Sequence, residues 1–82
     1  VETLYKLMDG EAEALEFKVQ SDFKYTKIPL KEMNLKQNTL IAGIIRGKKS
    51  IIPSGNDTIE IGDRIVVLTA GHRMHDLSDI IG

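Results

Sequence analysis

Two histidines and two aspartates lie close together near the end of the 82-residue sequence. His72 and His75 are three residues apart, and each is followed four positions later by an aspartate, Asp76 or Asp79. On a helix this spacing would bring the side chains near one another, as metal ligands sometimes are. The simpler interpretation is the polar face of a final helix, with His and Asp pairs on its surface. We therefore expect no metal site.

The other residues with reactive side chains do not form a catalytic pattern. Ser50, Ser54 and Ser78 lack the sharp glycine-flanked turn that exposes a nucleophile. The glycines are spread over turns, and no Gly-x-Gly-x-x-Gly motif precedes a helix. Gly62 and Asp63 are interpreted as a turn. We expect no catalytic residues, and the chain is not expected to be an enzyme.

Four cations lie near the predicted strand turns, namely Lys36, Arg46, Lys48 and Lys49. In a dimer these side chains could gather around an anionic ligand. The alternative is that they are exposed charges at hairpin tips, which discourage further strand pairing. The sequence alone leaves both interpretations open.

Composition limits the class of protein. The chain has 82 residues, no cysteine and a formal net charge of −1, so we expect one domain, no disulfide framework and a reducing cytoplasm. The mixed charges favour neither nucleic acid nor a membrane surface as a partner. No apolar run is long enough to span a bilayer. Because the sequence begins with Val1 and not with methionine, we expect a piece of a larger protein.

The first half of the chain predicts a hairpin and a short helix. Residues 1–8 and 14–19 read as extended stretches around the Asp9-Gly10 turn, although 1–8 also fit the end of a connecting helix. Pro29 suits the first turn of a helix that ends by Asn38. Its apolar side would hold Leu30, Met33 and Leu35.

The second half predicts strands and a closing helix. Residues 40–45 and 64–69 are apolar on both faces, which is typical of strands covered on two sides. Between them, residues 50–53 return as a short antiparallel strand that Pro53 ends. Residues 72–82 carry an apolar stripe of helical spacing, formed by Met74, Leu77 and Ile81 with Ile80 beside them.

These elements predict an α+β fold, with a small antiparallel or mixed sheet and its helices on one face. The opposite face is expected to carry Ile41, Ile45 and one set of side chains from 65–68, and nothing in the chain remains to cover it. We therefore expect a second copy to cover this face in a two-fold homodimer, with Ile41 and Ile45 at the dimer interface.

The order of these segments resembles a known family. "PLKEMNL", "TLIAGIIRG", "SIIPSGNDTIEIGDRIVVL" and "HDLSDII" together resemble the C-terminal regulatory domain of TrkA-type potassium-uptake proteins, the TrkA-C or RCK C-terminal domain. The resemblance implies that residues 1–82 form a single TrkA-C domain. Residues 1–13 would then be a lead-in segment from a preceding domain.

The resemblance implies a regulatory role in potassium uptake. Such domains follow a Rossmann-like domain, which is absent here and to which NAD(H) or ATP would bind. They form dimers within a cytoplasmic gating ring, peripheral to the membrane, that regulates the potassium-translocating subunit. The implied chain is therefore a homodimeric regulatory module without membrane insertion, nucleic acid or a cofactor of its own.

Some members bind cyclic di-AMP across the two-fold axis. By position, this resemblance points to Asn34, Leu35, Lys36, Asn38 and Thr39 as ligand-binding residues. The sequence departs from those members, because Lys36 stands where an arginine would be and a preceding aspartate is lacking. Lysine cannot repeat the planar two-pronged contact of arginine with a phosphate. A plain dimerisation domain without a ligand remains the alternative.

Overall fold

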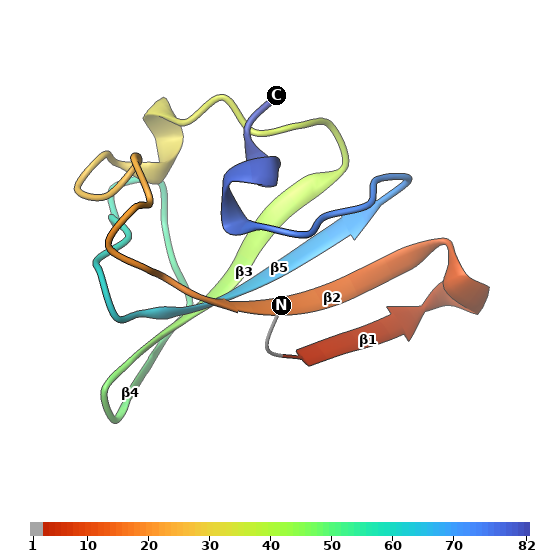
Figure 1. The fold of residues 1–82 in the computed structure, drawn as a ribbon, viewed down its shortest axis with the longest axis horizontal. Coiled ribbons are helices and arrows are strands. Elements are labelled where there is room, and N and C mark those ends of the chain that lie inside the picture. The colour runs from red at the N-terminus through yellow and green to blue at the C-terminus, as the bar shows by residue number, and fades with distance from the viewer. Residues whose placement is uncertain (1–2) are drawn as a thin grey trace.

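A computed structural model describes residues 3–82. It contains one five-stranded antiparallel sheet in the order β1-β2-β5-β3-β4 (Figure 1). The strands are β1 (Thr3–Leu7), β2 (Ala12–Lys18), β3 (Thr39–Arg46), β4 (Lys49–Ile51) and β5 (Arg64–Ala70). Three single turns of 3₁₀ helix accompany them: η1 (Met8–Gly10), η2 (Leu30–Glu32) and η3 (Leu77–Ile80). Of the two expected sheet types, the antiparallel one is present.

The N-terminal hairpin forms around the predicted Asp-Gly turn. Asp9 and Gly10 have φ values of 57° and 87°, a left-handed conformation that glycine adopts without steric cost and aspartate tolerates. β1 pairs with β2 in register, so the alternative of a connecting helix is wrong for residues 3–7. Val1 and Glu2, where the predicted strand began, lie outside the described residues.

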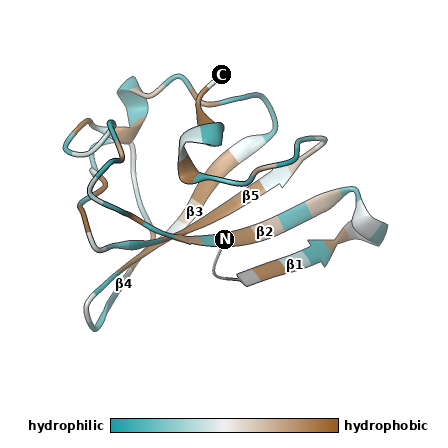
Figure 2. Ribbon diagram, in the orientation of Figure 1, coloured by the Kyte–Doolittle hydropathy of each residue, from teal (hydrophilic) through white to brown (hydrophobic). Residues whose placement is uncertain are grey.

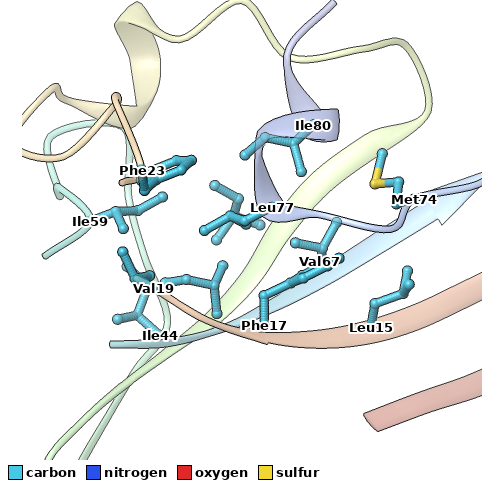
Figure 3. Packing of buried hydrophobic residues seen from close by; sticks show 12 residues of the cluster. Leu15, Phe17, Val19, Phe23, Ile44, Ile59, Val67, Met74, Leu77 and Ile80 are labelled. Carbon is cyan, nitrogen blue, oxygen red and sulfur yellow. The ribbon is translucent and has the colours of Figure 1, made fainter. Parts of the chain in front are cut away.

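The hydrophobic core lies between one face of the sheet and the segments that cross it (Figure 3). β2 and β5 alternate, so every second side chain points to this inner face. The buried apolar side chains are Leu15, Phe17, Val19, Phe23, Ile41, Ile44, Ile59, Ile65, Val67, Met74, Leu77 and Ile80. The covering layer consists of loops and the turns η2 and η3 (Figure 1).

A β-bulge in β3 changes which of its side chains face the core. Ile41 pairs with Val67 and Ile44 with Ile65, and the register shifts between Ile41 and Gly43. One extra residue in the strand therefore puts both isoleucines on the inner face. Ile41 is only 9% exposed, whereas Ile45 lies on the other face opposite Arg64. The expectation that Ile41 and Ile45 share the uncovered face was therefore wrong for Ile41.

The two predicted helices are much shorter than expected. Residues 72–82 contain only the turn η3, because Asp76 is its N-cap, so that the turn begins only at Leu77, and Ile81 is already extended and bridged to Leu35. The Asp79 carboxylate accepts hydrogen bonds from the backbone N–H groups of His75 and Asp76 at the start of this turn. Ile80 is fully buried in the core, and Ile81 packs against the core from a half-buried position. The helix expected after Pro29 is reduced to η2. No α-helix occurs among residues 3–82, so the α+β expectation holds only for the sheet and its one-sided cover. Within the same range, no helix is long and apolar enough to cross a membrane.

Candidate functional site

The segment 34–39, predicted to bind a ligand, is tied to the C-terminus of the chain. The N–H of Gly82 donates to the carbonyl of Asn34 (2.8 Å), and the N–H of Lys36 donates to the carbonyl of Ile80 (2.8 Å). Leu35 and Ile81 form an isolated antiparallel bridge between these contacts. Although 34–38 lies outside the main sheet, its backbone is therefore held in place.

The other end of this segment joins the sheet. Asn38 has a φ of 57°, and its carbonyl accepts a hydrogen bond from the N–H of Ala70 (3.0 Å). The hydroxyl of Thr39 is hydrogen-bonded to that of Thr69 (3.0 Å). Asn38 thus stands at the edge where the segment enters β3, while its side chain remains exposed.

The five predicted ligand residues form one continuous surface strip but do not converge on a cavity. Asn34 and Asn38 are exposed, and Leu35, Lys36 and Thr39 are half-buried. A groove of about 860 Å³ lies beside the strip, between the β1–β2 hairpin and residues 71–75. Its lining includes none of the five. A ligand on the strip would therefore need a second surface to enclose it.

His72 connects the predicted strip to this groove. Its side chain lines the groove, and its Nε2 lies 2.8 Å from the carbonyl oxygen of Gln37. A carbonyl only accepts, so Nε2 carries the proton in this contact. From the sequence, His72 was interpreted either as a metal ligand or, more simply, as part of the His and Asp pairs on the polar face of a final helix. Its contact with Gln37 joins residues 35 positions apart, and no local signal could have predicted it.

The histidines and aspartates near the C-terminus act within the chain. Among the described residues, no three His, Asp or Glu side chains come together in a way that could hold a metal ion. The Asp79 carboxylate accepts hydrogen bonds from the backbone N–H groups of Asp76 and His75. These hydrogen bonds hold the pKa of the carboxyl below its usual range. The nearby charge of Lys36 lowers the same pKa further. Lys36 therefore already has an acidic neighbour.

The four cations near the strand turns do not gather within one chain. Lys36 lies before the start of β3, whereas Arg46 ends this strand seven residues after Thr39, a separation of about 20 Å or more along the strand. Lys48 and Lys49 are exposed in the β3–β4 turn. In the single chain, only Lys48 and Lys49 therefore fit the interpretation as exposed charges at a hairpin tip.

Arg46 has a structural partner that the sequence analysis missed. Its Nε and Nη2 donate to the two carboxylate oxygens of Asp63 at 2.9 and 2.8 Å, and Nη2 also donates to the Thr58 carbonyl. Asp63 is 2% exposed and accepts a further hydrogen bond from the N–H of Glu60. Burial opposes the charge on Asp63, but these hydrogen bonds outweigh it and keep the pKa of its carboxyl low. Asp63 is thus more than the turn residue we expected.

The sheet and its one-sided cover are similar to those of a known protein. A solved structure of an RCK domain with cda superposes on the chain with a TM-score of 0.62 at 29% identity, covering 71% of this chain and 81% of that one. The fold is therefore that of an RCK-type domain, a small antiparallel sheet covered on one face.

Comparison of sequences gives the particular family. The TrkA-C domain model matches residues 14–82. The chain therefore belongs to the TrkA-C domain family. It is 29% identical over 69 residues to the Trk system potassium uptake protein TrkA homolog 1 of Methanosarcina mazei, and 27% identical over 73 residues to homolog 2. The two alignments cover 84% and 89% of this chain, but the chain spans only 15% and 16% of the length of those relatives.

Proposed function

We propose that this chain is the regulatory TrkA-C domain of a Trk- or Ktr-type potassium-uptake system. The observation that carries the proposal is the match to the TrkA-C family over residues 14–82, together with the two potassium-uptake relatives. The RCK-type fold supports it. In this role the domain regulates transport and has no catalytic activity of its own.

The proposed setting is a homodimer in the cytoplasm, peripheral to the membrane. The domain would act on the membrane potassium-translocating subunit through the full-length protein. NAD(H) or ATP would bind to a preceding Rossmann-like domain and not to the residues described here. A ligand that binds one arrangement of the paired domains more tightly than another would shift the population between them, and this shift would regulate transport.

We further propose a cyclic dinucleotide, cyclic di-AMP, as the ligand of residues 34–39. The similar solved structure is of an RCK domain with cda, which we interpret as this nucleotide. The strip offers the amides of Asn34 and Asn38, the hydroxyl of Thr39 and the charge of Lys36, which are groups that bind phosphates and bases. Because the strip is open in one chain, the same strip of a second copy would complete the site.

The alternative function is a dimerisation domain without a ligand. Two observations favour it: the strip does not line the groove beside it, and Lys36 lies close enough to Asp79 to lower the pKa of the Asp79 carboxyl. A lysine with an acidic neighbour is a weaker phosphate ligand, because the carboxylate competes for it. The two functions differ in whether Lys36 is needed for binding.

Titration calorimetry with cyclic di-AMP tests the ligand proposal. We expect saturable binding to the chain and at least a tenfold loss of affinity in Lys36→Ala, because one charge-assisted contact with a phosphate is removed. Lys48→Ala is the matched control, since Lys48 is exposed in the β3–β4 turn. Equal affinity of the wild type and Lys36→Ala would refute the role of Lys36. No heat at high micromolar nucleotide would favour the alternative function.

A further inference from the structure

β1 is the outermost strand at one edge of the sheet (Figure 1). Among residues 3–82 it pairs with β2 alone, so no strand lies beside the backbone N–H and C=O groups along its other side. Such groups can form hydrogen bonds with an added strand. The opposite edge strand, β4, has only three residues, whereas β1 has five. β1 is therefore the edge with more room for an extended segment.

The side chains of β1 do little to protect this edge. Charges, prolines and bulges usually prevent edge strands from pairing further. β1 pairs with β2 without a bulge and contains no proline, and Lys6 is its one charged residue. Leu4, Tyr5 and Leu7 are 47%, 64% and 41% exposed, and the hydropathy colouring of the strand changes from hydrophobic to hydrophilic along its length (Figure 2). A flat and mostly apolar edge of this kind favours strand addition.

The groove of about 860 Å³ lies over the inner face of β1. Leu4 and Lys6 line it from β1, and Leu15, which is opposite Leu4 on β2, lies in its floor. Residues 71–75, with the buried side chain of Met74, form the facing wall. An added strand beside β1 would turn every second side chain toward this groove. The groove can therefore supply side-chain contacts in addition to the backbone hydrogen bonds of the edge.

The residues of β1 determine which side chains an added strand should carry. On the inner face, two of its residues would lie opposite Leu4 and Lys6, and on the outer face one would lie opposite Tyr5. Cross-strand pairs are favourable between opposite charges and between apolar or aromatic side chains. In antiparallel pairing, the order along the added strand is therefore an acidic residue followed by two apolar residues.

The charges of the groove favour an acidic segment of another protein over a second copy of β1. Two β1 strands paired antiparallel about Tyr5 would place each Lys6 opposite Leu4 of the other copy, with no acid for either lysine. Arg73, which is exposed, provides a second cation on the wall. The acidic lining residue Glu11 follows η1 at the hairpin end, beyond the positions opposite Leu4 and Lys6.

We propose that the edge of β1 binds an extended acidic segment of another protein by strand addition, with a carboxylate at Lys6 and apolar side chains at Leu4 and Tyr5. This inference goes beyond the proposed function and depends neither on the nucleotide nor on the homodimer. The bound segment would lie along the groove that also contains His72. Because His72 contacts Gln37, the segment would lie close to a residue that holds the ligand strip in place.

Fluorescence anisotropy with a synthetic peptide tests the proposed edge. The probe is the capped, fluorescein-labelled peptide Thr-Thr-Glu-Val-Val-Thr-Thr, whose Glu-Val-Val places its side chains opposite Lys6, Tyr5 and Leu4 in antiparallel pairing. We expect binding to the chain that saturates below about 1 mM, with NMR shifts of backbone amides in β1 and in residues 71–75. Two control probes carry lysine in place of glutamate, or N-methyl groups on the amides of Glu-Val-Val.

A charge reversal at Lys6 tests which partner the edge selects. Lys6→Glu should weaken binding of the glutamate probe at least about tenfold and should bind the lysine probe more tightly than the wild type does. Lys48→Glu is the matched control, because it changes the net charge equally at an exposed lysine in the β3–β4 turn. It should leave both affinities unchanged. Circular dichroism verifies folding, and Lys6→Gln replaces Lys6→Glu if that variant unfolds.

Each outcome supports or overturns the proposal. Saturable binding that Lys6→Glu weakens and the lysine probe restores would support it. No binding, or equal binding of the N-methylated probe, would overturn strand addition, since N-methyl groups block the backbone hydrogen bonds of a ladder. Equal affinity of the wild type and Lys6→Glu would overturn the acidic partner. Shifts of the β1 amides with chain concentration alone would assign the edge to a second copy. None of these results contradicts the proposed function, which is tested by cyclic di-AMP binding.

Discussion

Asp63 is a buried carboxylate that accepts three hydrogen bonds, two from Arg46 and one from the backbone of Glu60. The Arg46 side chain is 41% exposed, so one partner of the pair remains in contact with solvent. Through Arg46 and the carbonyl of Thr58, the pair fastens the loop before β5 to the end of β3. Asp63, interpreted from the sequence as a turn residue, thus makes a tertiary contact with a residue 17 positions away.

Asp63→Asn should destabilise the chain by about 2–3 kcal/mol, less than the full cost of breaking a buried ion pair because Arg46 is partly solvated. The folded pKa of Asp63 is lowered, so its contribution is present above the unfolded pKa and is lost as the pH falls through the folded pKa. The free energy of unfolding should therefore decrease below about pH 4. Urea unfolding at about six pH values between about pH 2 and 7 measures both the stability lost in the variant and the pH dependence of stability.

The variant should also show a weaker dependence of stability on acid than the wild type. Some dependence should remain, because the pKa of Asp79 is lowered as well. Asp22→Asn is the matched control at an exposed carboxylate. A loss of stability in Asp63→Asn no larger than in Asp22→Asn would show that the buried pair contributes nothing.

At the scale of elements, the sequence predicted the strands well and the helices poorly. The apolar run over 64–69 and the Asp9-Gly10 turn are local signals, and the structure has a strand and a turn at these places. The stripe of Met74 and Leu77 was correctly identified as apolar, but its helical spacing also fits a single turn that packs on the core. Periodicity cannot distinguish these two cases in so short a segment.

Ile80 and Ile81 provide a matched test of the closing segment. Ile80 is fully buried, whereas Ile81 is half-buried and pairs with Leu35. Ile80→Ala should lower the free energy of unfolding by about 3–4 kcal/mol. Ile81→Ala should lower it by only about 1–2 kcal/mol, because this substitution removes less buried surface and leaves a smaller cavity. Chemical denaturation of both variants measures the difference. The reverse order would instead favour the helix that the sequence predicted, with Ile81 in the core.

The bulge in β3 was the feature of the sheet that the sequence could not reveal. The extra residue of a bulge cannot be recognised in an apolar run such as 40–45, because every residue of the run is suitable for either face of the sheet. Gly43 lies at the register shift, yet a Cβ there would meet its nearest atoms at 3.8 Å, an ordinary contact. The bulge therefore does not depend on the absence of a side chain at Gly43.

Gly43→Ala should consequently be tolerated. We expect a change in the free energy of unfolding within about 0.5 kcal/mol, since the lost flexibility of the unfolded chain favours alanine and no clash opposes it. Thermal unfolding measures this change. Gly62→Ala serves as the contrast, because Gly62 has a φ of 91° and alanine is strained there. A large loss in Gly43→Ala would mean that the bulge requires glycine.

At the scale of the whole molecule, the family was predictable because several motifs occur in a fixed order along the chain, and the TrkA-C match confirms it. The ligand strip was identified by position alone, and it stays a prediction. What the sequence could not supply are the long-range contacts of the strip, from Gln37 to His72 and from Asn34 to Gly82. These depend on how the C-terminal segment folds back on the sheet.

The most direct test of the proposed function is the stoichiometry of cyclic di-AMP binding, measured by calorimetry, with the mass of the same sample determined by light scattering. We expect a particle of twice the 9.1 kDa chain mass that binds one nucleotide per two chains. A monomer that releases no heat with the nucleotide would contradict it.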